Sequence, residues 1–514
     1  MHGPNKRFSL TGGALALLAL LLPAVAAAQD AGGEAVALPT TVDTPVSARI
    51  LSLFGLLVMM AIAWLMSNNR RKIHWRVVIW GVGLQVVLGL LVLRTDAGRG
   101  FFLGVKDAVN KLLGFYEAGA NMVFGSLMQV PGFSFALSVL PTIIFFSSLM
   151  AVLYHLRVMQ FVVGGVAWLM QRTLKTSGAE SLSAAGNIFV GQTEAPLLIR
   201  PFVTELTMSE LMAVMVGGFS TVAGGVMVAY VGMFRGVFPD MAGHLLTASI
   251  MSAPAALVIA KLMYPEDAKP VTASDHVPMA KTPYTNVIDA AATGAADGLK
   301  LSLNVLAMLL AFVALIALFN YVLGLPSFWQ HRGVLGDWFQ FFGAHTNLTL
   351  PDGCASMDAV SFEGSAGCIQ KMSAAAQSAG LTGLPSTDLW EVITFQRILG
   401  WVLAPIAWVM GVTWGDAVAV GQLLGTKTIV NEFVAYLDLA EMVRNGTITS
   451  PRSVVIATYA LCGFANFGSI AIQIGGIGAI APGRRQDLAK LGLKAMIGGT
   501  LAAQMTATVA GIFV

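Results

Sequence analysis

The chain has 514 residues, of which 56% are hydrophobic and only 11% carry a charge. A soluble chain needs about a quarter of its residues charged, so the composition excludes a soluble enzyme, a disordered chain and a nucleic-acid-binding protein. The balance of 30 basic against 27 acidic residues predicts no strongly basic surface. The 55 glycines suit close helix packing and broken helices in a bilayer. We therefore expect an all-α polytopic membrane protein.

The N-terminus has the pattern of a secretory signal peptide. Lys6 and Arg7 precede a short apolar run over residues 14–22, and an A-x-A pattern follows. This order of basic, apolar and small residues is typical of a cleavable signal. We interpret residues 1–28 as a signal peptide, with a retained helix as the alternative, and residues 29–47 as a periplasmic segment.

Eight apolar segments are long enough to cross the membrane as helices. They are Ile50–Met66, Val77–Leu93, Phe133–Tyr154, Leu211–Phe234, Leu245–Met263, Leu301–Leu323, Val454–Ile474 and Leu491–Phe513. A loop rich in arginine and lysine follows the first span, which places that loop in the cytoplasm and both termini in the periplasm. The amphipathic stretch Phe101–Tyr116 indicates an interfacial helix. The expected location is the cell inner membrane.

The segment 325–390 is polar and has little periodicity, and the span count places it in the periplasm. Cys354 and Cys368 both lie in it. Because disulfides persist on the oxidising side of a membrane, we predict that these two cysteines are bonded. Cys462 lies within an apolar span, where we expect it only to pack.

Two segments are too polar to cross lipid and too apolar to be loops: Ser183–Leu206, which contains Glu194, and Gly421–Val443, which contains Glu432. Each follows a similar phrase, VAWLM or IAWVM, and precedes a span that contains a Gly-Phe pair. Three crossings separate the two units, so the repeats are inverted. Inverted repeats with discontinuous helices are typical of transporters that bind their solute near the bilayer midplane.

The polar residues of these units indicate the kind of solute. A carboxylate at the centre of a membrane helix costs at least ~2.5 kcal/mol, which makes Glu194 and Glu432 candidate functional residues. Their polar companions are Asn187, Gln192, Thr193, Ser220, Thr221, Thr426, Thr428, Asn431, Asn466 and Ser469. With Phe464 as a flat wall, this set suits a neutral, polyhydroxylated, partly flat solute. For a single Asn or Thr, helix–helix contact is the structural alternative.

The nearest cations are Arg200 and Lys427. We expect each to flank its hairpin and to reach toward the membrane interface, as long basic side chains do. On that interpretation the polar set holds no cation, so an anionic solute such as a nucleotide fits it poorly.

The motifs GQTEAPLLIRP, NEFVAY and GFANFGSIAIQIGG resemble those of the concentrative nucleoside transporter family, and HLLTASIMSAPAAL and NVLAMLLAFVALIAL occur in the family's order. The resemblance implies a homotrimer whose protomers each have a scaffold and a moving transport domain. It implies that Gln192, Thr193 and Glu194 bind the base, that Phe464 lines the base pocket, and that Glu432, Asn466 and Ser469 hold the ribose. It also implies a sodium site made by the side chains of Asn187 and Thr221 and the backbone carbonyls of Val190 and Val222.

The resulting domain organisation follows the chain order. It comprises a signal peptide (1–28), a periplasmic segment (29–47), scaffold helices with an interfacial helix (48–157), a first transport repeat with its re-entrant hairpin (158–263), an interfacial helix and a scaffold helix (284–324), the periplasmic insertion (325–390) and a second transport repeat with its hairpin (391–514). The fold class is an all-α membrane protein with eight transmembrane helices and two re-entrant hairpins in inverted repeats.

We therefore expect a sodium-coupled nucleoside symporter that works by alternating access. The partners are a nucleoside, a sodium ion, the lipid bilayer and two further copies of the chain, with no nucleic acid, no enzyme activity and no cofactor beyond the co-transported ion. Gly191 beside Gln192 leaves room for a larger base, which predicts that purines and pyrimidines are both accepted. The alternatives are a proton-coupled symporter, with Glu194 or Glu432 carrying the proton, and an intramembrane hydrolase.

Overall fold

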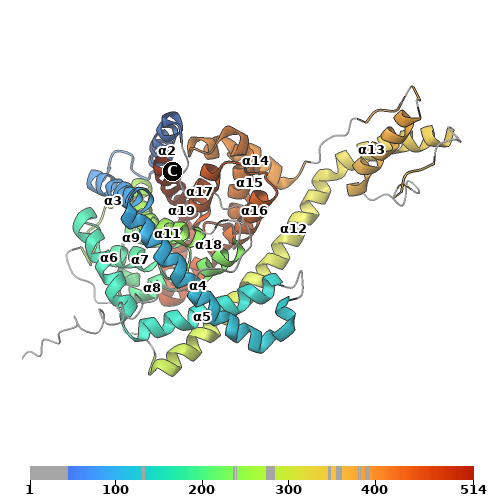
Figure 1. Ribbon diagram of the computed structural model, residues 1–514. Helices are drawn as coiled ribbons and strands as arrows, with labels where there is room; N and C mark the ends of the chain where they lie inside the picture. The colour runs from blue at the N-terminus through green and yellow to red at the C-terminus, as the bar shows by residue number, and fades with distance from the viewer. Residues whose placement is uncertain are drawn as a thin grey trace, which may run out of the picture.

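A computed structural model of the chain describes residues 44–514 apart from 130–133, 235–237, 239, 274–283, 345–348, 353, 355–361, 380, 383 and 388–392. All the regular secondary structure in these residues is helical (Figure 1). The predicted signal peptide and most of the predicted periplasmic segment lie outside the described residues.

The N-terminal part of the chain forms helices up to the end of the first predicted repeat. They are α2 (Val46–Leu65), α3 (Trp75–Arg94), α4 (Asp96–Phe124), η1 (Gly125–Gln129), α5 (Ser134–His155), α6 (Val158–Leu174), α7 (Gly178–Gly186), α8 (Ala195–Leu198), η2 (Arg200–Glu205), α9 (Met208–Ser220), α10 (Gly224–Met233) and α11 (Met241–Met263).

The C-terminal part contains the predicted insertion and the second repeat. Its helices are α12 (Val287–Ala344), α13 (Phe362–Ser378), α14 (Phe395–Val409), α15 (Trp414–Ile429), α16 (Glu432–Arg444), α17 (Pro451–Leu461), α18 (Phe467–Ile480), η3 (Pro482–Arg484) and α19 (Arg485–Phe513).

In the described part of the chain six helices are long and apolar enough to cross a membrane, or up to eight if two bent pairs are each counted as one span. The bent pairs join α5 to α6 at 77° and α14 to α15 at 118°. Two of the predicted spans are broken. Leu211–Phe234 is divided into α9 and α10, and Val454–Ile474 into α17 and α18, because the chain leaves the helix between each pair. The breaks lie at residues 221–223 and 462–466, and Gly463 is the one glycine within them.

The centre of the protein is formed by α9 and α11, whose side chains are almost all buried, and by the C-terminal part of α19 from Ala495 onward. α19 packs against α2, α9, α11 and α17, and thus joins the first and the second repeat. In contrast, α2 and α3 expose large apolar side chains such as Phe54, Leu57 and Trp80 along most of their length, as lipid-facing helices do. The buried centre is therefore built from helices of both repeats.

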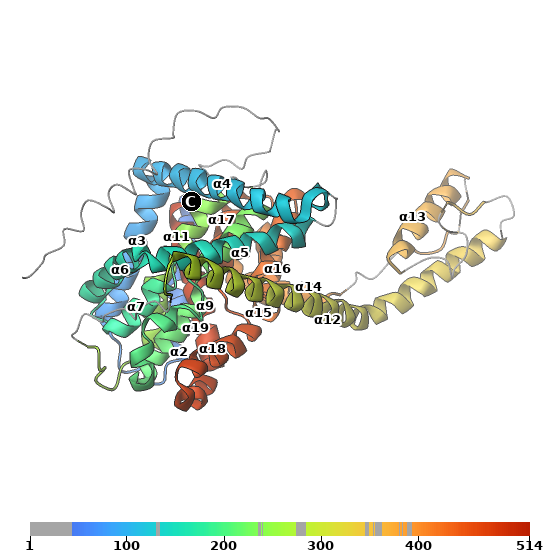
Figure 2. The same cartoon turned by 90° about the horizontal axis from the view of Figure 1, so that it is seen from below.

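α12 is one continuous helix of 58 residues, about 87 Å long at the rise of an α-helix. The expectation of a separate interfacial helix followed by a scaffold helix is wrong, and helix continues through the first 20 residues of the predicted insertion. Figures 1 and 2 show that the inner half of α12 runs along α5, while its outer half and α13 project away from the rest of the protein. Pro326 lies within the helix without ending it.

The projecting part has a small core of its own, centred on Trp338, Phe342 and Met372. The predicted disulfide between Cys354 and Cys368 is confirmed, with Cα atoms 5.8 Å apart. The segment is polar and has few apolar residues, yet those few pack on each other and on the disulfide.

Candidate functional site

The first hairpin is formed by α7, an irregular stretch, α8 and η2. A capping box starts α7: the Ser177 hydroxyl accepts from the Glu180 amide, and the Glu180 carboxylate accepts from the Ser177 amide. The helix ends at Gly186 with Asn187 as its C-cap, and Pro196 lies in the first turn of the short α8. Between them, the irregular backbone places polar side chains and carbonyl groups at the tip of the hairpin.

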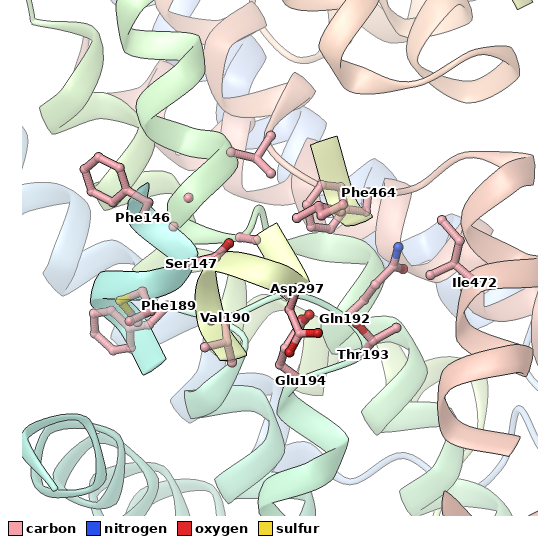
Figure 3. Close-up of a pocket in the computed structure, with 18 of the residues that line it drawn as sticks. Phe146, Ser147, Phe189, Val190, Gln192, Thr193, Glu194, Asp297, Phe464 and Ile472 are labelled. Atoms are coloured by element: carbon pink, nitrogen blue, oxygen red, sulfur yellow. The ribbon is translucent and has the colours of Figure 1, made fainter. Parts of the chain in front are cut away.

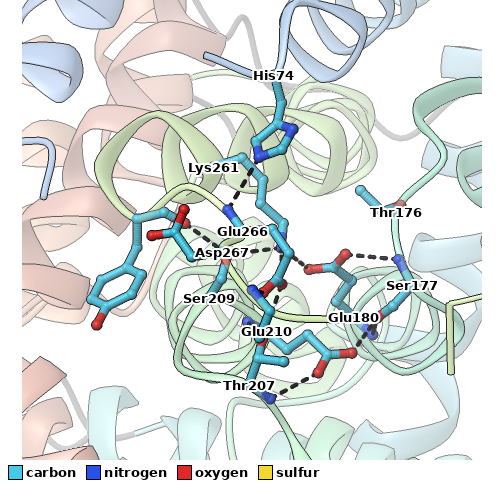
Figure 4. A network of polar contacts seen from close by, with 12 residues as sticks. His74, Thr176, Ser177, Glu180, Thr207, Ser209, Glu210, Lys261, Glu266 and Asp267 are labelled. Atoms are coloured by element: carbon cyan, nitrogen blue, oxygen red, sulfur yellow. Dashed lines mark hydrogen bonds and ion pairs between the residues drawn. The ribbon is translucent and has the colours of Figure 1, made fainter. Parts of the chain in front are cut away.

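A buried charged network holds the base of this hairpin (Figure 4). The ammonium group of Lys261, on α11, lies 2.8 Å from the Glu180 carboxylate and 3.2 Å from that of Glu266. The Ser177 hydroxyl donates to Glu210 at 2.6 Å, which links α7 to α9. Because Lys261 and Glu180 are only 5% and 2% exposed, each charge depends on the other, and the base of the hairpin is rigidly placed.

The second hairpin is formed by two regular helices, α15 and α16. Asn431 caps α16, and its side-chain oxygen accepts from the Val434 amide at 3.0 Å. Glu432 is thus the first residue of α16, where the helix dipole favours a negative charge. The hairpin therefore presents its carboxylate from a helix N-terminus.

The two broken helices meet at their breaks. Gly463, in the break between α17 and α18, has φ = +146°, a conformation that side chains rarely adopt. A Cβ atom added to it would lie 2.7 Å from the carbonyl oxygen of Phe219, in the last turn of α9. The backbones of the two breaks therefore touch, which brings the polar residues of both repeats to one place.

A cavity of about 350 Å³ opens beside this crossing (Figure 3). Its wall contains all seven residues expected to bind the nucleoside, namely Gln192, Thr193, Glu194, Glu432, Phe464, Asn466 and Ser469. Phe146 and Ser147 of α5 and Asp297 of α12 form part of the rest of the wall. The cavity thus lies between the two hairpins and the helices that the sequence analysis places in the scaffold.

The carboxylate of Glu432 is buried and bonded on both oxygens. The hydroxyl of Tyr230, on α10, donates to Oε1 at 2.9 Å, and Nδ2 of Asn466 donates to Oε2 at 3.2 Å. The Asn466 side-chain oxygen in turn accepts from the Ser469 amide at 2.8 Å and caps α18. Glu432 is therefore held in one orientation by both broken helices.

The amide of Gln192 is oriented from both ends. Its Nε2 donates to the Ser469 hydroxyl at 3.1 Å, and its Oε1 accepts from Nε2 of Gln473 at 3.1 Å. Gln473 also donates to the Met215 carbonyl oxygen in α9, so it ties the first hairpin to both broken helices. The donor and acceptor of Gln192 therefore have fixed directions.

Glu194 differs from Glu432 because its side chain is exposed to the cavity. In Figure 3 it lies close to Asp297, across from Phe464. A Cβ atom at Gly191 would collide with the Glu194 carboxylate. The space beside Gly191 was expected to admit a larger base. In this structure the Glu194 carboxylate occupies that space.

Three of the candidate sodium ligands, Asn187, Thr221 and Val222, are buried near the end of α9, whereas Val190 lies in the first hairpin and lines the cavity. Asn187 and Thr221 are each 1% exposed, and Val222 is fully buried. The Thr221 hydroxyl donates to the Gly217 carbonyl oxygen at 3.1 Å, and a Cβ at Gly217 would lie 3.1 Å from Nδ2 of Asn187. Both polar atoms of the Asn187 amide are buried without a hydrogen-bond partner. The donor set is made of neutral oxygens, which is the kind of ligand that suits a hard monovalent cation.

The two cations near the hairpins lie in different places. Arg200 is exposed, as expected. Lys427 is 1% exposed, and its ammonium group donates to the Ala460 carbonyl oxygen at 2.8 Å. The expectation that Lys427 reaches toward the interface is therefore wrong, because α15 turns this face toward α17 rather than toward lipid.

Sequence reasoning missed several polar residues of the site, among them Tyr230, Gln473 and Asp297. Gln473 follows Ser469 by one helical turn, so its position on the same face of α18 was a usable signal. Tyr230 lies within an apolar segment that gave no sign of a binding role. Asp297 lies on α12, outside both repeats. Their contacts depend on helices that are distant in the sequence.

Family models for sodium-dependent nucleoside transporters match most of the chain. The model described as "Na+ dependent nucleoside transporter C-terminus" matches residues 244–351 and 366–511, and the corresponding N-terminus model matches residues 54–127. A model described as "Nucleoside recognition" matches residues 136–236, which contain the first hairpin.

Similar proteins occur in bacteria and vertebrates. An uncharacterized transporter of Haemophilus influenzae is 42% identical over 474 residues, which cover 90% of this chain and 97% of that protein. The uncharacterized transporter YutK of Bacillus subtilis is 41% identical, with 90% and 98% covered. Human solute carrier family 28 member 3 is 38% identical over 90% of this chain, and the match spans 60% of the human protein.

Solved structures of CNTnw have the same fold. The inward-facing, substrate-bound structure matches with a TM-score of 0.72 and 38% identity, over 90% of this chain and 98% of that one. An outward-facing structure of a CNTnw variant matches with a TM-score of 0.74 and 39% identity, over 91% and 98%. With the two hairpins, the crossed broken helices and the shared cavity, these matches show that the chain belongs to the concentrative nucleoside transporter family.

Proposed function

We propose that this protein is a sodium-coupled symporter that imports purine and pyrimidine nucleosides across the inner membrane by alternating access. The observation that carries the proposal is that Glu194, Glu432 and the oriented amide of Gln192 all line one cavity between the two hairpins. The family match supports nucleoside as the substrate and sodium as the co-transported ion.

The second hairpin suits the ribose. The Glu432 carboxylate is fixed by Tyr230 and Asn466, so its remaining lone pairs are preorganised to accept hydrogen bonds from sugar hydroxyls. The first hairpin suits the base, because Gln192 offers an amide with a fixed donor and acceptor and Phe464 offers a flat apolar face. Glu194, exposed to the cavity, accepts from ring or amino N–H groups.

Sodium would be held by the side chains of Asn187 and Thr221 with the carbonyls of Val190 and Val222. The two unpartnered atoms of Asn187 support a ligand role, because buried polar groups normally have partners. These neutral groups also favour sodium over proton coupling, since none of them gains or loses a proton at any ordinary pH. One cation that moves down about 100 mV supplies about 2.3 kcal/mol, enough for nearly fifty-fold accumulation.

Coupling follows from where the ion would sit. A sodium ion between Asn187 and the end of α9 would hold the tip of the first hairpin against its broken helix, and so would order Gln192 and Glu194. The hairpins then open to opposite sides of the membrane in turn. In this scheme α2–α5 and α12 belong to the scaffold, the two repeats form the transport domain, and three protomers assemble through their scaffolds.

The direct test is uridine uptake into proteoliposomes that contain the purified protein. We expect uptake to require sodium outside and to fall to background when choline replaces it. Uptake that is unchanged in choline would contradict sodium coupling, and uptake that instead follows an inward proton gradient would support the proton-coupled alternative.

Substrate breadth needs a separate measurement. Unlabelled adenosine and guanosine should each reduce the uptake of labelled uridine, because one cavity serves both base classes. Cytidine serves as the positive control and a free sugar as the negative control. If cytidine competes and neither purine nucleoside does, the protein is a pyrimidine-specific carrier.

A further inference from the structure

Lys427 lies in the last turn of α15, near the tip of the second hairpin, and is buried. Its ammonium group donates to the carbonyl oxygen of Ala460 at 2.8 Å. α17 ends at the next residue, Leu461. The Ala460 carbonyl is therefore one of the last carbonyls of the helix, which have no backbone amide within the helix to accept a hydrogen bond from. Lys427 therefore caps the negative end of a helix that stops inside the protein.

Asn187 holds the matching position in the first hairpin. It directly follows α7, whereas Lys427 lies in the last turn of α15, and the Asn187 side chain lies against Gly217 in the last turn of α9. Thus one side chain from the first helix of each hairpin meets the last turn of the next helix, just before that helix breaks.

The sequence registers of the two repeats agree with this pairing. Asn187 and Lys427 are 240 residues apart, which is also the separation of Ala167 and Ala407 in the VAWLM and IAWVM phrases. The broken helices α9 and α17 end 241 residues apart. The two residues therefore have similar positions in the two repeats, and each contacts the last turn of the helix that follows its hairpin.

The two equivalent positions have opposite chemistry. At the end of α9 the contacts that the described residues make are hydroxyl bonds from Ser220 and Thr221 to Gly217, and the amide of Asn187 has no partner. At the end of α17 a charged ammonium group bonds the carbonyl directly. One helix end is lined by neutral oxygens, and the other carries its own cation.

We propose that the Lys427 ammonium group is the built-in cation of the second hairpin and does at the end of α17 what the transported sodium ion does at the end of α9. It holds α15 against α17 and so positions Glu432, which begins α16 just beyond the hairpin tip. Lys427 is a positioning residue in this role. The inference rests on the proposed sodium site of the first hairpin.

A functional difference between the hairpins follows. Sodium enters and leaves during transport, so the first hairpin is ordered only when the ion is bound. The Lys427 ammonium group is part of the chain and, unlike the ion, cannot leave the protein. The second hairpin should therefore keep its order without sodium, and only the first should respond to the ion.

Hydrogen–deuterium exchange on the purified full chain in lipid nanodiscs, without nucleoside, tests this directly. In the wild type, sodium chloride should slow exchange in peptides from 178–205 relative to choline chloride and leave peptides from 414–444 unchanged. Lys427→Met should speed exchange in 414–444 by about tenfold, the size expected for the loss of one charge-assisted bond, and should keep the sodium response in 178–205. Arg200→Met, the exposed cation of the first hairpin, is the matched control and should change neither segment.

Uridine binding at saturating sodium gives the second measurement. Lys427→Met should raise the dissociation constant by about tenfold, while Lys427→Arg, which keeps the charge, should stay within about threefold of the wild type. The arginine variant also tests the proposal if the methionine variant does not fold.

Three results would overturn the inference: unchanged exchange in 414–444 for Lys427→Met, a loss of the sodium response in 178–205 in that variant, or equal impairment of Lys427→Arg and Lys427→Met. The last result would mean that side-chain shape rather than charge is required. A wild type that shows the exchange pattern but binds no uridine would contradict the proposed substrate and still support the role of Lys427.

Discussion

The two hairpins have the same place in inverted repeats but are built differently. The first has a rigid base, where Lys261 and Glu180 pair in a buried network, and an irregular tip at which Asn187 lacks partners and Glu194 is open to the cavity. The second has regular helices up to its tip, and its carboxylate, Glu432, is buried and bonded on both oxygens.

This difference separates two tasks. A buried amide without partners costs about 1–3 kcal/mol, which a bound cation can recover, so the first tip is suited to respond to an ion. The second tip has its partners already and is suited to bind a solute without rearrangement. Under the proposed function, the first half of the symmetric fold would respond to the ion and the second would hold the sugar.

The largest expected effect is at the base of the first hairpin. Lys261→Met should lower the free energy of unfolding by about 3–5 kcal/mol, because it leaves the buried Glu180 carboxylate without its cation. Thermal unfolding in detergent measures it. Lys72→Met, which removes an exposed pair with Asp267, should cost less than about 1 kcal/mol. Equal effects of the two variants would show that the base is not a rigid anchor.

The next effect concerns the second tip. Glu432→Gln should weaken nucleoside binding by about 100-fold, because sugar hydroxyls lose a charged acceptor, and should leave the half-saturating sodium concentration nearly unchanged. Uptake with sodium and uridine varied independently separates the two. Glu441→Gln, at an exposed position on the same helix, should have no effect. A changed half-saturating sodium concentration in Glu432→Gln would contradict the proposal that the second hairpin binds the nucleoside and not the ion.

Asn187→Ala tests the first tip. We expect the half-saturating sodium concentration to rise by about tenfold, since a neutral oxygen ligand is lost. Nucleoside affinity at saturating sodium should change much less. Asn445→Ala, an exposed asparagine just after the second hairpin, is the control. A normal sodium dependence in Asn187→Ala would exclude this residue as an ion ligand.

The smallest effect is expected at Tyr230. Tyr230→Phe removes the hydroxyl that orients Glu432 and should weaken uridine binding by about five- to tenfold. Tyr436→Phe is matched, because Tyr436 packs on Tyr230 but donates to the Thr458 carbonyl instead. It should reduce stability without changing uridine affinity. Similar losses of affinity in both variants would assign Tyr230 to packing alone.

Much of the site could be predicted because its signals are local. Carboxylates within otherwise apolar, glycine-rich segments mark places where a chain cannot simply cross lipid. The seven residues expected to bind the nucleoside come from the motifs around Glu194 and Glu432 and from the GFANFGS stretch, and all seven line the cavity. The predicted position of Lys427 was wrong because such signals are only local. The sequence shows that a lysine lies near the hairpin, but it does not show which neighbouring helix the lysine faces.

By itself the sequence determined the membrane class, the two hairpins and the two broken helices, because hydropathy, charge and glycine act within a short stretch of chain. Only the tertiary structure decided that α12 is continuous, that Tyr230 reaches Glu432 across 202 residues and that Gln473 reaches Gln192 across 281. The physical reason is that these contacts exist only after the two repeats cross. Which polar atoms then meet depends on how whole helices pack, which no local pattern encodes.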